Sequence, residues 1–286
     1  VEAMTDSRYL TAISPGMPAT DGAGVQLTRM VGTPQLDMVD PFLMLDRIDS
    51  DDPDSYIAGF PNHPHRGFET VTIMLEGLMR HQDSVGNDGL LRPGDVQWMT
   101  AGRGIIHSEL PEMVDGRLKG FQLWVNLPAE KKMMAPGYQD ITADRISTVV
   151  FDGGAARVIA GSFNGTDGPA QSQVPIRLLD VRLAAGTEWT ITPDAGNDVF
   201  LCVYEGSVEA ADNDGGRHGI VKPGVAVFGG QGDVTVTAGP DGADILYCEG
   251  EPIREPVEKY GPFVMNTREE IVQAVEDYNS GKLATA

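Results

Sequence analysis

Two short motifs place histidines and a carboxylate at a spacing that suits metal binding. The first is His63-Pro-His65 and the second is His107-Ser-Glu109. Residues i and i+2 of an extended strand point to the same side, so each motif can aim two side chains into one interior. If both motifs line the same interior, three imidazoles and one carboxylate converge. Such a set suits a first-row divalent metal and leaves coordination positions open for water or substrate.

A second carboxylate, Glu69, has the same strand parity as His65 and is an alternative ligand. Strand parity alone does not choose between Glu69 and Glu109. A single histidine in a strand is more often a hydrogen-bonded core residue than a ligand, so neither motif is decisive by itself. Two such motifs in one Gly-rich region favour a metal, because burying three imidazoles and a carboxylate without one is costly.

The two remaining histidines, His81 and His218, fall in polar segments at equivalent places of the two halves of the chain. Polar loops of this kind usually lie at the protein surface. We therefore expect both imidazoles to be exposed and neither to bind the metal.

The composition describes a strongly acidic chain. Its 286 residues include 42 Asp and Glu against 21 Lys and Arg, which gives a formal net charge of −21. No compact basic cluster offsets this charge, so no direct contact with nucleic acid is expected. No apolar stretch approaches the ~20 residues that cross a bilayer, and a secretory signal is not recognisable, so we expect no membrane partner and a cytoplasmic location.

The two cysteines, Cys202 and Cys248, each lie inside an apolar, strand-like run. Their spacing is not that of a Cys-x-x-Cys redox motif or zinc site. We expect two buried, reduced thiols rather than a disulfide.

Short strands are the elements that must hold the two histidine motifs. Glycine and proline are plentiful, at 35 and 19 residues, and runs with helical periodicity are few, which predicts strands joined by turns. Strand-length apolar runs occur at 41–45, 70–75, 96–99, 121–125, 157–160, 176–183, 199–204 and 245–248. One amphipathic helix is predicted at 266–278, with Thr267 and Glu270 at capping-box spacing and Gly281 at its exit.

The two halves of the chain repeat one another. A Glu-Gly pair, a later Pro-Gly turn and a glycine eight residues beyond that turn occur in each half, at 76–77, 93–94 and 102 and again at 205–206, 223–224 and 232. The agreement of turns and spacing predicts a duplicated β domain. A polar stretch near 128–145 separates the halves, which predicts an N-terminal domain at 1–132, a linker at 133–145 and a C-terminal domain at 146–286.

Four stretches of the sequence closely resemble the pirin family. They are DPFLMLD at 40–46, HPHRGFET at 63–70, PGDVQWMTAGRGIIHSE at 93–109 and YGPFVMNTREEI at 260–271. The resemblance covers nearly the whole chain. It implies an all-β bicupin, with two facing cupin β-barrels of the β-sandwich or jelly-roll type and a short C-terminal helix.

The pirin resemblance also implies the ligand set. It assigns the iron ligands to the motif positions His63, His65, His107 and Glu109, and excludes Glu69. It implies one metal per chain, held by the N-terminal domain, because the C-terminal pirin domain has none and the second half here has no histidine at 192–198 or 233–237. Iron(II) is the family expectation, while nickel, copper, cobalt, manganese or zinc could occupy the same ligands.

Two functions are consistent with this resemblance. Pirins are similar to quercetin dioxygenases, which implies an oxidoreductase that opens a small, flavonol-like aromatic substrate with O2. Glu109 would then be catalytic as well as a ligand, because it could accept the proton of the flavonol hydroxyl. The alternative is an iron-dependent, redox-sensing regulator that acts through a protein partner. We favour the enzyme, because the site is complete and keeps open coordination positions, and we expect a monomer.

Overall fold

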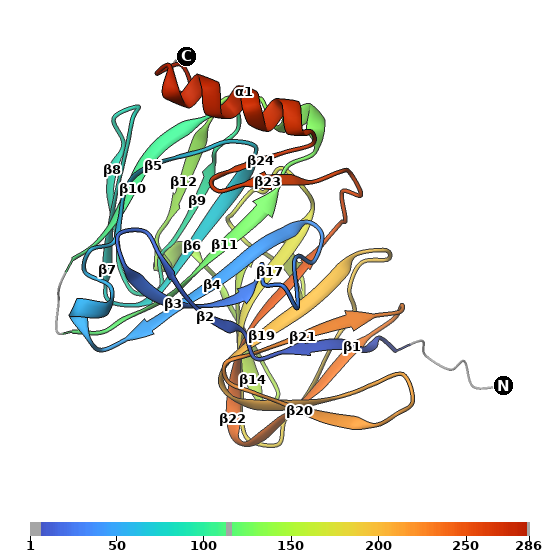
Figure 1. Ribbon diagram of the computed structural model, residues 1–286. Helices are drawn as coiled ribbons and strands as arrows, with labels where there is room; N and C mark the ends of the chain where they lie inside the picture. Colours follow the sequence, from blue (N-terminus) through green and yellow to red (C-terminus); the bar gives the residue numbers. More distant parts are fainter. Residues whose placement is uncertain (1–6, 113–115, 285–286) are drawn as a thin grey trace. The chain divides into compact units, whose positions relative to one another are not determined.

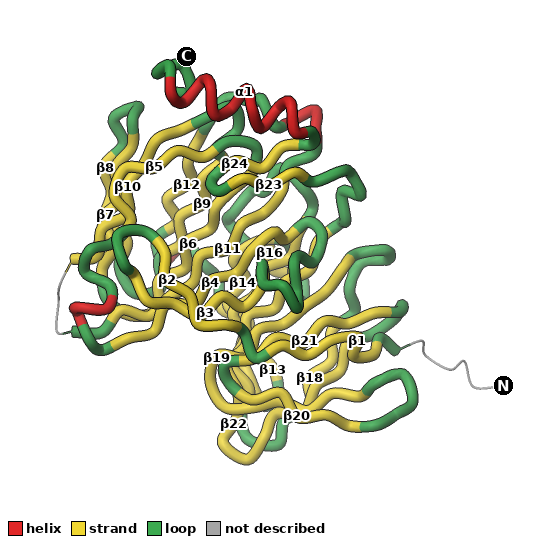
Figure 2. Tube along the Cα trace, in the orientation of Figure 1, coloured by secondary structure: helices red, strands yellow, loops and turns green. Residues whose placement is uncertain are grey.

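The computed structural model describes residues 7–112 and 116–284, mostly as β-strands with one α-helix near the C-terminal end (Figures 1 and 2). Within these ranges, no helix is long and apolar enough to cross a membrane. Contacts divide the chain into two compact units that interleave along the sequence. The histidine unit comprises Pro18–Arg29, Phe42–Asp144 and Ile253–Ala286, and the companion unit comprises Val1–Met17, Met30–Pro41 and Arg145–Pro252.

Two antiparallel sheets build the histidine unit. Its strands are β2 (Met17–Asp21), β3 (Val25–Val31), β4 (Phe42–Ser50), β5 (Phe60–His65), β6 (Phe68–Glu76), β7 (Leu78–Asp83), β8 (Asp88–Leu91), β9 (Val96–Thr100), β10 (Ile105–Glu112), β11 (Leu118–Asn126) and β12 (Gly137–Ile141). The larger sheet has the order β12-β9-β6-β11-β4-β3-β2, and the smaller has the order β5-β10-β7-β8. The two sheets form a sandwich, which confirms the expected all-β architecture of the β-sandwich type.

Apolar side chains from both sheets fill the space between them. Strand β6 is buried on both faces, and its alternate residues Thr72 and Met74 lie on the face towards the smaller sheet. One core cluster consists of Val25, Leu27, Ile48, Tyr56, Met74, Met79, Leu91 and Leu118. This packing holds the smaller sheet, which carries both histidine motifs.

The C-terminal segment of the histidine unit consists of β23 (Glu258–Tyr260), β24 (Phe263–Met265) and the helix α1 (Arg268–Asn279). The predicted capping box is confirmed, because Glu270 N donates to Thr267 Oγ1 over 3.2 Å and Thr267 N donates to Glu270 Oε2 over 3.0 Å. Helix α1 packs against the β23–β24 hairpin and buries Ile271 and Ala274 (Figure 1). Three 3₁₀ turns, η1 (Pro53–Ser55), η2 (Ala129–Lys131) and η3 (Ala143–Arg145), complete the unit's helical elements.

A nine-stranded antiparallel sheet dominates the companion unit. Its strands are β1 (Tyr9–Ser14), β13 (Thr148–Phe151), β14 (Gly154–Ala160), β17 (Ile176–Leu183), β18 (Glu188–Ile191), β19 (Asp198–Ala211), β20 (Arg217–Val221), β21 (Gly224–Gly229) and β22 (Val234–Gly250), and a small hairpin adds β15 (Ser162–Phe163) and β16 (Thr166–Asp167). Cys202 and Cys248 lie buried in this sheet as thiols that are not joined in a disulfide, which confirms that expectation.

The two compact units differ from the two consecutive domains that we expected, because each unit consists of three separate segments of the chain. Residues 137–141 of the expected linker form β12, which pairs with β9. Strand β12 lies at the edge of its sheet and exposes polar side chains such as Gln139 and Asp140, so it has no apolar run that would reveal a strand. The segment from Ile253 onward belongs to the histidine unit rather than to the unit formed by the second half.

A buried carboxylate organises one end of the companion unit. Glu249 is fully buried and pairs with Arg177, whose Nη1 lies 2.9 Å from Glu249 Oε2. The other oxygen accepts hydrogen bonds from Asp194 N over 2.7 Å and from Asn197 Nδ2 over 2.9 Å. The hydroxyl of Tyr247 donates to Oε2 over 2.9 Å. Every oxygen of this carboxylate is therefore satisfied within the unit.

We predict that Glu249→Gln lowers the free energy of unfolding by about 3 kcal/mol, because it leaves Arg177 without its buried counter-charge. Denaturant unfolding measures the change. The matched control is Glu209→Gln, which removes an exposed pair with Arg217 and should cost at most about 1 kcal/mol. Equal losses in the two variants would contradict a special role for the buried pair.

Candidate metal centre

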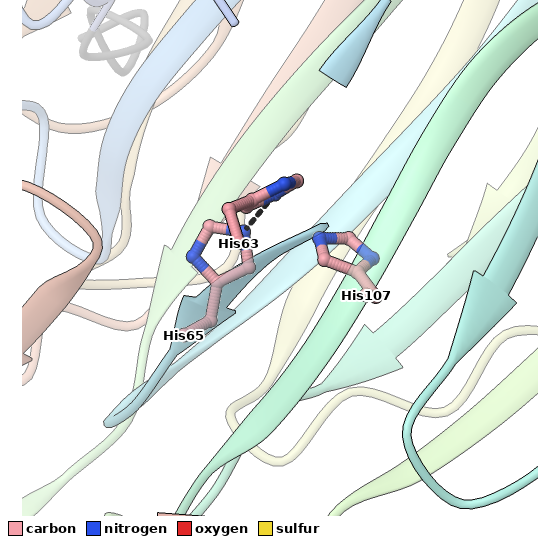
Figure 3. A group of neighbouring side chains, drawn as sticks. All are labelled: His63, His65 and His107. Atoms are coloured by element: carbon pink, nitrogen blue, oxygen red, sulfur yellow. Dashed lines mark hydrogen bonds between the residues drawn. The ribbon is translucent and has the colours of Figure 1, made fainter. Parts of the chain in front are cut away.

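The smaller sheet brings the two histidine motifs side by side. Strand β10 lies between β5 and β7 and pairs antiparallel with both. In the β5–β10 register His107 is opposite His63, and His65 is opposite Ile105. Figure 3 shows the three imidazoles gathered in one place. The i,i+2 spacing of the first motif therefore aims both of its side chains at the second motif.

The three rings are close enough to share one ion. The Nε2 atoms of His63 and His65 lie 3.0 Å apart, and the three residues offer ring nitrogens that all lie within 4.8 Å of one another. The ring centroid of His107 is 4.3 Å from that of His63 and 4.9 Å from that of His65. The structure thus brings together three of the four ligands predicted from the sequence.

Surrounding groups orient these imidazoles. In the tautomer that carries the proton on Nδ1, His63 donates to the carbonyl oxygen of Pro61 over 2.8 Å, which leaves Nε2 as an electron-pair donor. The edge of the His65 ring meets Phe68 and Trp124 at centroid distances of 5.1 and 5.4 Å. Both ring nitrogens of His107 are buried without a hydrogen-bond partner in the structure. A metal shared with His63 and His65 would coordinate one of these two nitrogens, so the residues present fit a divalent cation.

Burial also controls the charge of the site. It lowers the pKa of His65 and of His107 well below the usual value of 6.5, and the neighbouring imidazoles lower both further. Both rings are therefore neutral at pH 7, and their electron pairs are available to a metal without release of a proton.

Neither candidate carboxylate joins the three histidines. The β5–β10 register shifts between His107 and Glu109. Glu109 Oε1 accepts from Thr72 Oγ1 over 2.9 Å, and Oε2 accepts from Gln122 Nε2 over 2.7 Å. Thr72 and Gln122 are cross-strand partners in the larger sheet, so the Glu109 carboxylate links the two sheets of the sandwich. Glu69 is fully buried and accepts from Thr100 Oγ1 over 2.7 Å.

A pocket reaches the carboxylate of Glu109 from inside the sandwich. It is small, partly open to solvent and lined by residues of both sheets. Its polar lining consists of Asp46, Thr72, Glu109 and Gln122, and its apolar lining includes Leu27, Ile48, Phe60, Met74, Met79, Leu118 and Phe121. The lining is thus mostly apolar, with four polar side chains among its members.

His81 is buried, so the expectation that it lies on the surface is wrong. It is 1% exposed, and its ring centroid lies 5.1 Å from that of His107 and 4.8 Å from that of Tyr138. The segment we interpreted as a loop begins inside β7, where inward positions alternate and Met79 shares the buried side with His81. That period-2 pattern was the signal available in the sequence. His218 is exposed as expected and hydrogen-bonds to Asp212 over 2.6 Å.

The lowered pKa values of His65 and His107 predict how the stability of the metal-free protein depends on pH. Below pH 6.5 the unfolded chain binds protons on these imidazoles and the folded chain does not. Their contribution to stability is thus complete above pH 6.5 and is lost as the pH falls. Between about pH 6.5 and 5, we expect the free energy of unfolding to fall more steeply than in the double variant His65→Gln/His107→Gln. Parallel curves from denaturant titrations would contradict this account.

Comparisons with known proteins agree with this fold. The family model for pirin matches residues 24–125, and the model for the pirin C-terminal cupin domain matches residues 178–284. A pirin-like protein of Caulobacter vibrioides is 49% identical over 278 residues, which cover 96% of this chain and 99% of that protein.

Solved structures extend the comparison. The crystal structure of a quercetin 2,3-dioxygenase from Acinetobacter baumannii superposes with a TM-score of 0.87 at 33% identity, over 98% of this chain and 99% of that one. A bacterial pirin from Escherichia coli in complex with nickel(II) shares the fold, with a TM-score of 0.63 at 22% identity over 84% of this chain and 100% of that one. The chain therefore belongs to the pirin family and consists of two cupin domains.

Proposed function

We propose that the protein is a metal-dependent dioxygenase that opens the ring of quercetin-type flavonols with O2. The observation that carries this proposal is the group of three convergent imidazoles in the same sheet as Glu109, whose carboxylate lines a largely apolar pocket. The similarity to the Acinetobacter baumannii quercetin 2,3-dioxygenase supports the choice of substrate and reaction.

In this proposal His63, His65, His107 and Glu109 hold one divalent metal. Iron(II) is the proposed ion. An imidazole-rich set with one carboxylate also accepts nickel, copper, cobalt, manganese or zinc, and the nickel(II) complex of the Escherichia coli pirin supports this tolerance. When bound, the metal would bind the deprotonated flavonol and orient it towards O2.

Residues of the chain itself would prepare the substrate. Glu109 accepts the proton of the flavonol hydroxyl, a role that needs a carboxylate within hydrogen-bonding reach. Thr72 and Gln122 hold that carboxylate in one orientation through one hydrogen bond to each oxygen. Apolar side chains such as Leu118 and Phe121 line the pocket and exclude water from it.

We expect protein loaded with a measured amount of iron to consume quercetin aerobically and to release carbon monoxide. His63→Ala should abolish both, because it removes a ligand of the metal. The flavonol absorbance and the evolved gas are the readouts, and His218→Ala, which removes an exposed imidazole, is the control. If the loaded protein consumes neither quercetin nor related flavonols, the dioxygenase proposal fails. Metal-dependent binding to a protein partner, the regulatory alternative, would then be the hypothesis to test.

Glu109→Gln separates the two roles proposed for Glu109. The amide can still offer an oxygen to a metal but is a much weaker proton acceptor than a carboxylate. Turnover should therefore fall further than metal content, both measured on the same preparation. Glu112→Gln, on the same strand but partly exposed, controls for the loss of a charge. An equal loss of metal and turnover in Glu109→Gln would remove the proton-acceptor role.

A further inference from the structure

We propose that the C-terminal arm, residues 258–284, positions the metal centre through the ion pair between Asp277 and Arg66. The arm comprises β23, β24 and α1, and lies about 150 residues or more beyond the histidine motifs in sequence. This inference rests on the proposed metal centre, and it assigns to the arm a role in holding the ligands in place. Its evidence is a set of contacts to the residues that flank those ligands.

The arm forms backbone hydrogen bonds to the residue that follows His65. Arg66 N donates to the carbonyl oxygen of Pro262 over 3.3 Å, and Val264 N donates to the carbonyl oxygen of Arg66 over 3.0 Å. The β23–β24 hairpin thus continues the strand pairing at the end of β5. A shift of this hairpin would therefore move the backbone that carries His65.

The Arg66 side chain connects the arm to both histidine motifs. Its guanidinium is almost fully buried and donates from Nη1 to Asp277 Oδ2 on α1 over 2.8 Å. Its Nε donates to the carbonyl oxygen of Arg103, in the turn that leads into β10 and His107. Arg66 is the residue after His65, and its guanidinium is held by a carboxylate of the arm. The same guanidinium binds the chain four residues before His107.

A second buried cation reinforces the same junction. Lys132 Nζ donates to the carbonyl oxygens of Gly67 and Val264 over 2.8 and 3.0 Å, and to Asn126 Oδ1 over 2.7 Å. The arm approaches so closely that a Cβ added at Gly67 would lie 1.9 Å from the carbonyl oxygen of Val264. The arm backbone is therefore packed directly against the turn after His65.

The arm contacts the residues that follow His65 and precede His107. The face of α1 that carries Val272 and Glu276 is exposed. Groups that orient metal ligands typically change metal affinity about 10–100-fold when they are removed. Asp277 touches no ligand, so it is a positioning residue that acts through Arg66. The structure predicts that its loss changes the geometry of the bound metal, in addition to the stability that is lost with the ion pair.

The test compares Asp277→Asn with Glu276→Gln in the full chain, using Co²⁺ as the probe. Glu276 is the exposed neighbour on the same helix, so both variants lose one negative charge. We expect Asp277→Asn to alter the visible absorption of bound Co²⁺ and to release it to a chelator about 10-fold or more faster than wild type. Glu276→Gln should behave as wild type. Asp277→Asn should also melt at a lower temperature, because it leaves the buried Arg66 guanidinium without its counter-charge, so spectra and release rates are compared well below the unfolding transition of both variants. Wild-type spectra and release rates in Asp277→Asn would overturn the proposal.

Two further measurements make the outcome decisive. If Asp277→Asn does not fold, Arg66→Lys replaces it, because lysine keeps the charge but cannot reach both Asp277 and the Arg103 carbonyl. An altered Co²⁺ spectrum in folded Arg66→Lys supports the proposal, and an unchanged one overturns it. Wild-type protein that binds no Co²⁺ overturns the metal centre itself. If wild type binds Co²⁺ and Asp277→Asn or Arg66→Lys shows the same spectrum as wild type, only the role of the arm is overturned.

Discussion

Three imidazoles that face one another in the interior of a sheet must replace the hydrogen bonds that water would give them. A buried polar group without a partner costs about 1–3 kcal/mol, and a charged imidazole in the same place costs more. One nitrogen of His63 hydrogen-bonds to the carbonyl oxygen of Pro61. Neither nitrogen of His107 has a hydrogen-bond partner in the described chain. A cation shared by the three rings would coordinate one nitrogen of His107 and so remove part of this cost. The neutral state of the rings and their fixed orientation both serve that arrangement.

The position of Glu109 follows from a local irregularity in the same sheet. The shift of register between His107 and Glu109 alters the regular pairing of β10 with β5 at this point. Irregularities of this kind redirect side chains and are common beside active sites. Here the carboxylate reaches Thr72 and Gln122 of the facing sheet and lines the pocket. The imidazoles and the Glu109 carboxylate thus come from one strand pair. The imidazoles contact one another, whereas the carboxylate contacts the facing sheet.

Features set by neighbours along the chain could be predicted from the sequence, and features set by distant segments could not. The pairing of His63 with His65 and the Thr267–Glu270 capping box depend on spacings of two or three residues, and the structure has both. The contact of the buried His81 ring with Tyr138 was not predictable, because Tyr138 lies in β12, a strand whose polar sequence gave no sign of pairing. The contact of Asp277 with Arg66 joins residues more than two hundred positions apart, which no local pattern encodes.

The hydrogen bonds of Glu109 are compatible with both of its proposed roles. A carboxylate oxygen has two lone pairs, and Thr72 and Gln122 occupy one on each oxygen. One lone pair therefore remains on each side, for a cation on one oxygen and for a substrate proton on the other. The two hydrogen bonds also fix the plane of the carboxylate, so a cation or a proton must approach it along the lone-pair directions that remain.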